Sequence, residues 1–326
     1  MRSSSIELLR IVAMLSIVVG HVFYHGFHNE CTDVLWLRPF TCCGVNIFVL
    51  ISGYYGINFK LKSLFSLLFM VSFYTICSGI IEYFCWGNVF SLSRMSGVLL
   101  PFTGNHYYWF VTCYIYLYLL SPILNQGVLW LYDNCYLKKA CVILLYVNFV
   151  GGWLLSNSLI NKDGFNVMHF VFLYLLGRSF CLYKWNTKLS TMKLFASYII
   201  LFLVGATNYG GGSKLTDYNS PLMVAIALVM LCAFLRLKIQ NKVINKIAKT
   251  MFAVYLLQDG IAGQSAYELV YHLYSQSNIV GILFYVLSLF LIAYILEVIR
   301  FPIMNMVFKR IKIFTDYSKK ICKSRE

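Results

Sequence analysis

The sequence predicts an all-α, polytopic integral membrane protein with about ten transmembrane helices and both termini in the cytoplasm. Of its 326 residues, 60% are hydrophobic and only 12% are charged, whereas soluble domains carry roughly twice that share of charge. The apolar residues gather in runs of roughly 18–25 residues, the length of helix that crosses ~30 Å of hydrocarbon. These observations exclude a soluble enzyme, a disordered chain and a secreted disulfide-rich scaffold.

The first apolar run follows a short basic start that resembles a signal peptide. Glu7 and Arg10 lie at its beginning and no small-x-small cleavage site follows it, so we interpret it as a retained transmembrane helix. Polar residues interrupt two later runs, Arg178 in the sixth and Gln258-Asp259 in the ninth. In chain order the predicted spans cover residues 6–27, 41–58, 63–86, 107–127, 139–157, 165–182, 193–210, 219–236, 250–272 and 278–299.

The distribution of basic residues supports this order of spans. With the N-terminus inside, only four of the 27 Lys and Arg residues fall outside, and the other 23 fall inside or near inner helix ends. A wrong span count would invert every later loop and destroy this bias. The outer residues are Arg38, Arg94, Lys162 and Lys214. The inner clusters are Lys60/Lys62, Lys138/Lys139, residues 178–193, residues 236–249 and the tail.

The net charge of +15 therefore reflects cytoplasmic retention of positive loops and not nucleic-acid binding. We expect a membrane-embedded domain over residues 1–306 and a basic cytoplasmic tail over residues 307–326 on the anionic inner leaflet. The 11 cysteines include no C-x-x-C pair and no clustered ligands, so we predict buried apolar thiols and no metal site.

Ionisable side chains inside a membrane are costly, and the first span holds the densest set. Arg10 and His21 are eleven residues apart, within about 20° of three full helical turns, so they share one face and lie ~16 Å apart. Glu7 precedes Arg10 by one turn, where the two can pair. The alternative is an interfacial ion pair with His21 as a hydrogen-bonded interior residue. For His25 and His28, near the outer boundary, a structural role is favoured.

Several segments together resemble one family. Residues 6–14 (IELLRIVAM), followed by His21, resemble the opening helix of the acyltransferase family 3 membrane proteins. Residues 46–54 (NIFVLISGY) are similar to the second-helix signature of that family. Weaker similarities are YWF at 108–110, LYLLSP at 117–122, YLLG at 174–177 and AVYLL at 253–257.

The resemblance implies transfer of an acyl group, usually acetyl, from acyl-CoA to a sugar hydroxyl. Typical acceptors are cell-surface polysaccharides or their lipid-linked precursors, modified at a bacterial cytoplasmic membrane. It also implies that His21 is the essential histidine and Arg10 the first-helix arginine. Acyl-CoA is then a co-substrate, with no permanently bound cofactor. Membrane lipids and the glycan acceptor are the other expected partners.

Two positions depart from the family pattern. Many members carry an R-x-x-R pair after the second span, where this chain has Lys60 and Lys62. Lysine holds phosphate as a point charge without the bidentate fork of arginine. Many members also have a histidine after the YLL of the ninth span, where this chain has Gln258 and Asp259.

The residue types fit this chemistry. A sugar hydroxyl is a weak nucleophile near pH 7 and needs a base, for which His21 is the candidate. We expect Arg10, Lys60 and Lys62 to meet the anionic donor, although the two lysines also fit a role as inner-leaflet anchors. The developing oxyanion needs a hydrogen-bond donor, and Asn46, Ser52, Trp109 and a backbone N–H are the open alternatives. The candidate substrate-binding residues are Glu7, Asn46, Ser52, Trp109 and Asp259.

Two questions stay open in the sequence. Asp259 either orients His21, holds acceptor hydroxyls or caps a helix interrupted near Gly260 and Gly263. The alternative function is a secondary transporter or flippase for a lipid-linked sugar, and a further one is an inactive relative that binds glycan intermediates. Transporters often carry paired broken helices in two halves, whereas most polar residues here lie in the first two spans. This asymmetry favours a single catalytic centre.

Overall fold

The computed structural model describes residues 3–23, 36–87, 96, 108–157, 161, 163–185, 190–207, 214–260, 266 and 279–323. Within these ranges the ordered elements are helices, with no strand. The α-helices are α1 (Ser4–His21), α2 (Arg38–Cys42), α3 (Gly44–Tyr55), α4 (Leu61–Trp86), α6 (Trp109–Asp133), α7 (Leu137–Tyr146), α8 (Val167–Leu182), α9 (Thr191–Thr207), α10 (Pro221–Arg236), α11 (Lys242–Ile247), α12 (Met251–Gln258) and α14 (Ile279–Lys323). A π-helix, η4 (Val147–Leu154), continues α7, and short 3₁₀ turns η6 (Lys214–Thr216) and η7 (Ala248–Thr250) precede α10 and α12.

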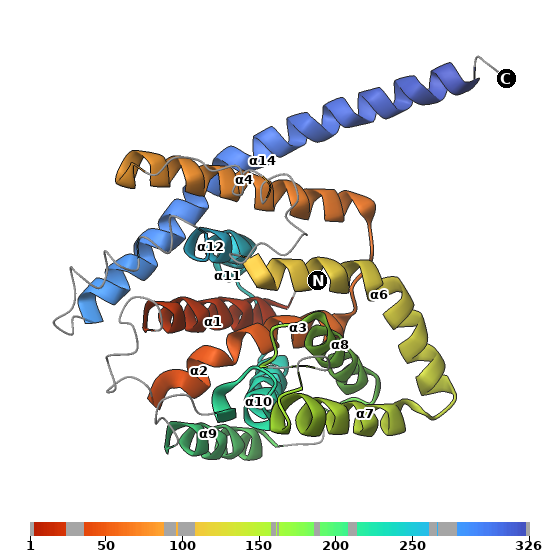
Figure 1. The fold of residues 1–326 in the computed structure, drawn as a ribbon, viewed down its shortest axis with the longest axis vertical. Coiled ribbons are helices and arrows are strands. Elements are labelled where there is room, and N and C mark those ends of the chain that lie inside the picture. Colours follow the sequence, from red (N-terminus) through yellow and green to blue (C-terminus); the bar gives the residue numbers. More distant parts are fainter. Residues whose placement is uncertain are drawn as a thin grey trace.

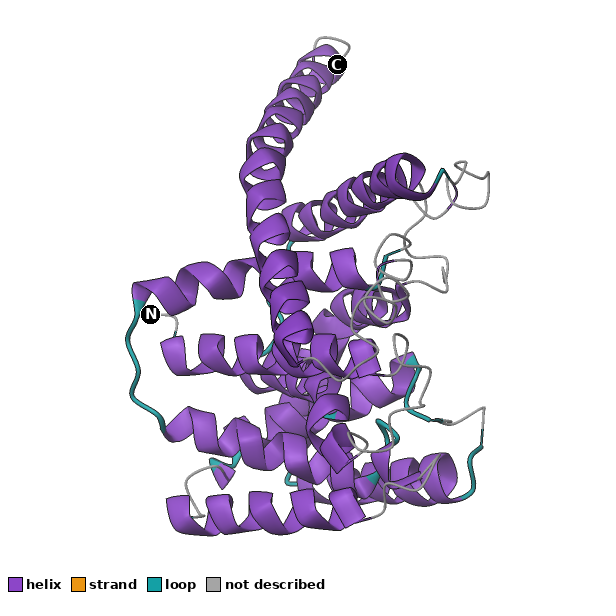
Figure 2. Cartoon of the chain, turned by 90° about the vertical axis from the view of Figure 1, so that its left-hand side faces the viewer, coloured by secondary structure: helices purple, strands orange, loops and turns teal. Residues whose placement is uncertain are grey.

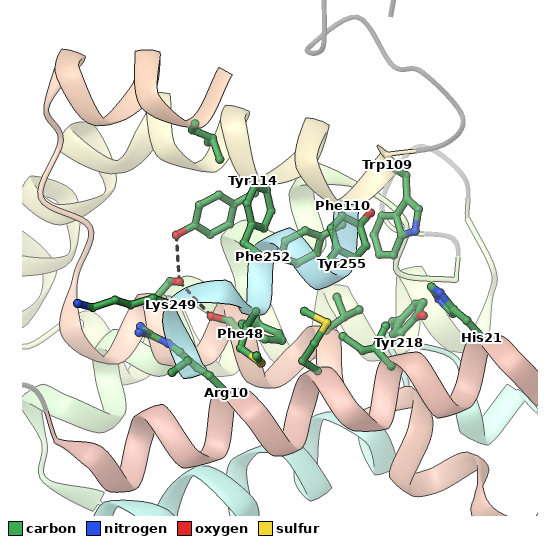
Figure 3. Close-up of a pocket in the computed structure, with 17 residues that line it drawn as sticks. Arg10, His21, Phe48, Trp109, Phe110, Tyr114, Tyr218, Lys249, Phe252 and Tyr255 are labelled. Atoms are coloured by element: carbon green, nitrogen blue, oxygen red, sulfur yellow. Dashed lines mark hydrogen bonds between the residues drawn. The ribbon is translucent and has the colours of Figure 1, made fainter. Parts of the chain in front are cut away.

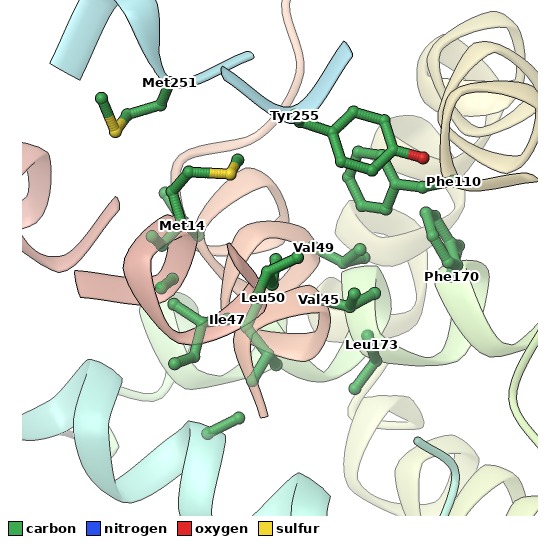
Figure 4. Close-up of a cluster of buried hydrophobic side chains, with 14 of the residues drawn as sticks. Met14, Val45, Ile47, Val49, Leu50, Phe110, Phe170, Leu173, Met251 and Tyr255 are labelled. Atoms are coloured by element: carbon green, nitrogen blue, oxygen red, sulfur yellow. The ribbon is translucent and has the colours of Figure 1, made fainter. Parts of the chain in front are cut away.

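Helix α3 lies in the interior of the bundle, where it packs against α1, α8 and α10. Its sequence is apolar on nearly all sides, which is the pattern of a helix buried on all sides. Ile47, Leu50 and Ile51 have no exposed surface. Figure 4 shows Ile47 and Leu50 among side chains of α1, α6, α8 and α12 in one apolar cluster. The core of the molecule is therefore built around the second predicted span.

Helices α4 and α14 lie at one edge of the bundle, and the C-terminal part of α14 extends beyond it (Figures 1 and 2). Both carry large apolar side chains that the protein leaves exposed, such as Phe84, which is 80% exposed. Exposed apolar stretches of this extent are typical of surfaces in contact with lipid. Between the two helices, Tyr74 donates to Glu297 over 3.0 Å, and Glu297 pairs with Arg300 at 2.7 Å.

The described helices confirm a helical protein with segments of membrane-spanning length. Within the described residues, eight of the ten predicted spans each fall on one α-helix or, for the fifth, on α7 and η4 together, and the first falls on α1. The number of ten crossings and the cytoplasmic placement of both termini remain predictions. Among the described residues, five segments are long and apolar enough to cross a membrane: Ser4–His21, Leu61–Trp86, Leu137–Leu154, Lys214–Arg236 and Ile282–Arg310.

Two predicted spans differ from the structure. The second is divided at Cys43 into α2 and α3, and the ninth is helical as α12 only to Gln258. Asp259 occupies the C-cap of α12 and Gly260 follows it, so the interruption that these residues predict is confirmed. His25, His28 and Gly263 lie outside the described residues. Helix α14 runs without a break across the predicted domain boundary at residue 306, and the boundary itself stays a prediction.

Helix α1 and the segment that ends in α12 run side by side in the same direction. The backbone N–H of Asn241 donates to the Ser4 hydroxyl over 3.0 Å, and Gln258 contacts His21 at the other end. Two membrane-spanning helices that run in the same direction are separated by an odd number of crossings, and the predicted order places seven spans between these two. This pairing forms one wall of the site.

Candidate functional site

A cavity of about 230 Å³ lies between α1, α3, α6 and α12 (Figure 3). Arg10 and Lys249 lie at one end, and His21 and Trp109 lie at the other. The walls between the ends are mainly apolar and aromatic. The described residues that line it are Arg10, Met14, Ile17, His21, Val45, Phe48, Ser52, Leu67, Trp109, Phe110, Tyr114, Tyr218, Ala248, Lys249, Met251, Phe252 and Tyr255.

Helix α1 contributes one face to this cavity. Arg10, Met14, Ile17 and His21 follow one another at intervals of three or four residues, so they share one side of the helix. The predicted common orientation of Arg10 and His21 is confirmed by their place on one cavity wall. At 1.5 Å per residue, their eleven-residue separation is about 16 Å along the helix. The cavity therefore joins a cationic end to an imidazole across much of the helix length.

Glu7 holds Arg10 at the cationic end. Arg10 Nη1 donates to Glu7 Oε1 over 3.0 Å, which confirms the predicted pairing one turn apart. Glu7 is only 4% exposed and does not line the cavity, whereas Arg10 does. The predicted contact of Glu7 with substrate thus has no geometric support, and its observed contact orients the guanidinium.

His21 is in contact with Gln258, a residue that the sequence marked only as a departure from the family pattern. The Gln258 side chain is fully buried, and its Nε2 lies 3.1 Å from His21 Nδ1. The oxygen and nitrogen of a carboxamide exchange places by a 180° turn, so this amide can either donate to the ring or accept from it. With its oxygen toward Nδ1–H, the amide selects the ring tautomer in which Nε2 carries the lone pair.

Asp259 turns away from His21 toward Tyr255. The Tyr255 hydroxyl donates to Asp259 Oδ2 over 2.5 Å, one helical turn away. Tyr255 lines the cavity and Asp259 does not. Of the three roles considered for Asp259, the structure supports that of a helix cap, because Asp259 is the C-cap residue of α12. Direct contact with the acceptor has no geometric support.

If His21 is the base of the acyl transfer that the resemblance implies, Gln258→Ala should lower kcat by roughly tenfold while leaving KM for the acyl donor unchanged, because one hydrogen bond that orients His21 is lost. Steady-state kinetics with varied acyl-CoA measure both constants. Asp259→Asn is the matched control, since asparagine still accepts from Tyr255, and it should keep most of the activity. A collapse of turnover in Asp259→Asn with normal turnover in Gln258→Ala would reverse the two roles.

Asn46 lies behind the cavity wall. Its side chain is fully buried, with Nδ2 donating to the Tyr218 carbonyl over 2.8 Å and Oδ1 lying 3.0 Å from His169 Nε2. Asn161 lies 3.3 Å from the other ring nitrogen of His169. Asn46 is absent from the lining, so its predicted substrate contact has no geometric support. Its bonds hold the backbone of Tyr218, which does line the cavity.

Ser52 and Trp109 line the cavity, as expected of substrate-binding residues. Ser52 donates to the Phe48 carbonyl over 3.0 Å and lies 3.3 Å from the Tyr114 hydroxyl. At the opposite end, the Trp109 ring lies 5.5 Å from that of Tyr218, centroid to centroid. The cavity thus offers hydroxyl groups toward its cationic end and an aromatic wall beside His21 (Figure 3).

Lys60 and Lys62 do not line the cavity. Lys60 is the N-cap residue of α4, and the Lys62 ammonium lies 5.8 Å from the Phe308 ring on α14. The second cation in the cavity is Lys249. Its place in the basic run 236–249 gave a signal for the cytoplasmic side, but the run alone did not indicate which member turns inward.

The sequence matches a family model described as an acyltransferase domain over residues 3–298. The match covers every described element from α1 to the first part of α14. No curated protein and no solved structure matches the chain.

Proposed function

The chain belongs to acyltransferase family 3, and from this premise we propose that it transfers an acetyl group from acetyl-CoA to a sugar hydroxyl. The proposed acceptor is a cell-surface polysaccharide or its lipid-linked precursor. The supporting observation is the single cavity that joins two cations to a histidine held by a buried amide. Family membership does not favour the alternative of a transporter or flippase.

The donor enters, in this proposal, at the Arg10 end. Arg10 and Lys249 bring two positive charges to that end, and the bias of basic loops predicts that it faces the cytoplasm. The phosphates of acyl-CoA would pair with these cations. The slender arm that carries the thioester would then run along the apolar wall toward His21, over about 16 Å of helix.

The acceptor approaches, in the same proposal, at the His21 end. Its hydroxyl donates to His21 Nε2, and as its oxygen bonds to the thioester carbonyl carbon, the proton passes to the ring. Collapse of the tetrahedral adduct breaks the carbon–sulfur bond, and the departing thiolate takes that proton. The products are an O-acyl sugar and free CoA. The aromatic rings of Trp109 and Tyr218 offer a surface for the C–H face of the sugar.

The proposal is tested by giving acetyl-CoA with a labelled acetyl group to the purified protein in lipid nanodiscs, with glycan extracted from cells that lack it. We expect free CoA to appear in step with label on the glycan, which mass spectrometry detects as one acetyl increment per modified sugar. Movement of glycan across vesicle membranes without consumption of thioester would support transport instead.

We expect Arg10→Lys to raise KM for acetyl-CoA by roughly tenfold with a smaller change in KM for the acceptor. Lysine keeps the charge beside Glu7 but loses the planar fork that holds a phosphate with two hydrogen bonds. Initial rates with each substrate varied in turn give both constants. Lys62→Gln, an exposed residue away from the cavity, is the control and should change neither constant. Weakened acceptor binding with unchanged donor binding would contradict the assignment.

A further inference from the structure

A second, open cleft of about 550 Å³ lies beside the turn that joins α3 to α4. We call it the Arg178 cleft, and its polar lining consists of Tyr55, Asn58, Asn125, Gln126 and Arg178, with Gly56 at the turn. Arg178 is the one charged residue among the described residues that line it. Ser52 lines the first cavity and Tyr55 lines this cleft, one helical turn further along α3.

Arg178 has no anion to pair with in the described part of the chain. Its Nε is buried without a hydrogen-bond acceptor among those residues, and no carboxylate lines the cleft. A buried guanidinium N–H without an acceptor costs free energy, more so because the group is charged. An acceptor from outside the described residues would satisfy this N–H.

The turn that faces Arg178 is held by a set of specific hydrogen bonds. The Tyr174 hydroxyl accepts from Ile57 N over 2.9 Å and donates to Asn125 Oδ1 over 2.7 Å. Asn125 Nδ2 donates in turn to the Ile57 carbonyl over 2.9 Å, and the Tyr118 hydroxyl accepts from Lys60 N over 2.9 Å. Such fixed surroundings lower the cost of ordering a ligand.

Gly56 lets the guanidinium lie against this turn. Its φ of +75° belongs to the left-handed region that glycine adopts without strain. Arg178 Nη1 is 3.5 Å from the position that a Cβ on Gly56 would occupy. The exposed side chains of Asn58 and Gln126 add hydrogen-bond donors at the rim.

We propose that the Arg178 cleft binds a phosphate group. A guanidinium recognises the oxygens of phosphate with two parallel hydrogen bonds, and the open mouth admits a group that belongs to a larger molecule. The phosphate belongs either to the nucleotide end of the acyl-CoA donor or to the headgroup of an anionic lipid. The nucleotide source rests on the proposed function, whereas the site itself does not.

Binding of adenosine 3′,5′-bisphosphate to the protein in phosphatidylcholine nanodiscs tests the nucleotide source without turnover. We expect Arg178→Gln to weaken this binding by about tenfold or more, because a charge-assisted pair is lost, and Arg178→Lys to weaken it less. Arg236→Gln removes the same charge from a residue that lines neither cavity and should leave binding unchanged.

Nanodiscs that contain phosphatidylglycerol test the lipid source, with retained lipid counted by native mass spectrometry. Loss of retained phosphatidylglycerol in Arg178→Gln, with bisphosphate binding unchanged, assigns the site to a headgroup. Loss of bisphosphate binding or loss of retained phosphatidylglycerol would support a phosphate site. Neither measurement involves acyl transfer, so both results remain valid if the proposed function fails. If Arg178→Gln remains folded by size-exclusion chromatography and changes neither binding, the proposal is overturned.

Discussion

Replacement of His21 by alanine is expected to abolish acyl transfer while the protein remains folded and inserted. The imidazole lines the cavity at the end where the aromatic wall lies, and Gln258 holds one of its ring nitrogens. Alanine leaves no group there to take the proton of the acceptor hydroxyl. General-base catalysis contributes about 10²–10⁴-fold to a rate, so turnover should fall below the limit of a CoA-release assay.

A second variant separates a catalytic role from a structural one. His21→Gln keeps a hydrogen-bonding group beside Gln258 but has no basic nitrogen near pH 7. If His21 is the base, His21→Gln should be as inactive as His21→Ala, with donor binding preserved in both. Near-normal turnover in His21→Gln would show instead that this position serves only as a hydrogen-bonded interior residue.

The face of α1 could be predicted from the sequence because it depends on a local regularity. The spacing of Arg10 and His21 fixes their common orientation at 100° per residue, whatever lies opposite. The Glu7–Arg10 pair depends on the same regularity. The positions of most helices could be predicted from the length of the apolar runs. A segment that spans a membrane must form all its backbone hydrogen bonds within itself, so such a run is helical whatever its neighbours are.

The partners of these residues could not be predicted in the same way. Gln258 meets His21 across 237 residues of chain, and helical periodicity carries no information on which helices become neighbours. Asn46 shows the same limit, since its polarity at membrane depth was visible but its partner on α8, His169, was not. Lys249 lines the cavity where Lys60 was expected. Lys249 lies just before α12, and the parallel course of α1 and α12 brings it beside Arg10.

Replacement of Gly53 by alanine is expected to destabilise the whole bundle. The helices α3 and α8 approach closely at Gly53, since a Cβ there would lie 2.8 Å from Tyr174 Cα and 2.9 Å from its carbonyl carbon. Both atoms belong to the backbone of α8, so no rotamer change relieves the clash. Overpacking of this kind costs about 1–3 kcal/mol and sometimes more. Thermal unfolding of the solubilised protein should show a lower midpoint.

Gly127 provides the matched control on α6. Nothing lies within 4 Å of a Cβ built there, so Gly127→Ala meets no clash. Alanine is a better helix former than glycine by about 1 kcal/mol, so the unfolding midpoint of Gly127→Ala should stay the same or rise. If Gly53→Ala and Gly127→Ala unfolded at the same temperature, the close approach of α3 and α8 would be wrong.

Gly177 on α8 completes the argument, because it faces the same crossing from the other side. A Cβ on Gly177 would lie 2.5 Å from the Leu50 carbonyl oxygen and 3.0 Å from Tyr54 N, both on α3. Gly177→Ala should therefore destabilise the bundle as Gly53→Ala does. Once one alanine has separated the two helices, the second meets less resistance, so the double variant should lose less stability than the sum of the single losses. Strict additivity would mean that the two glycines do not share one contact.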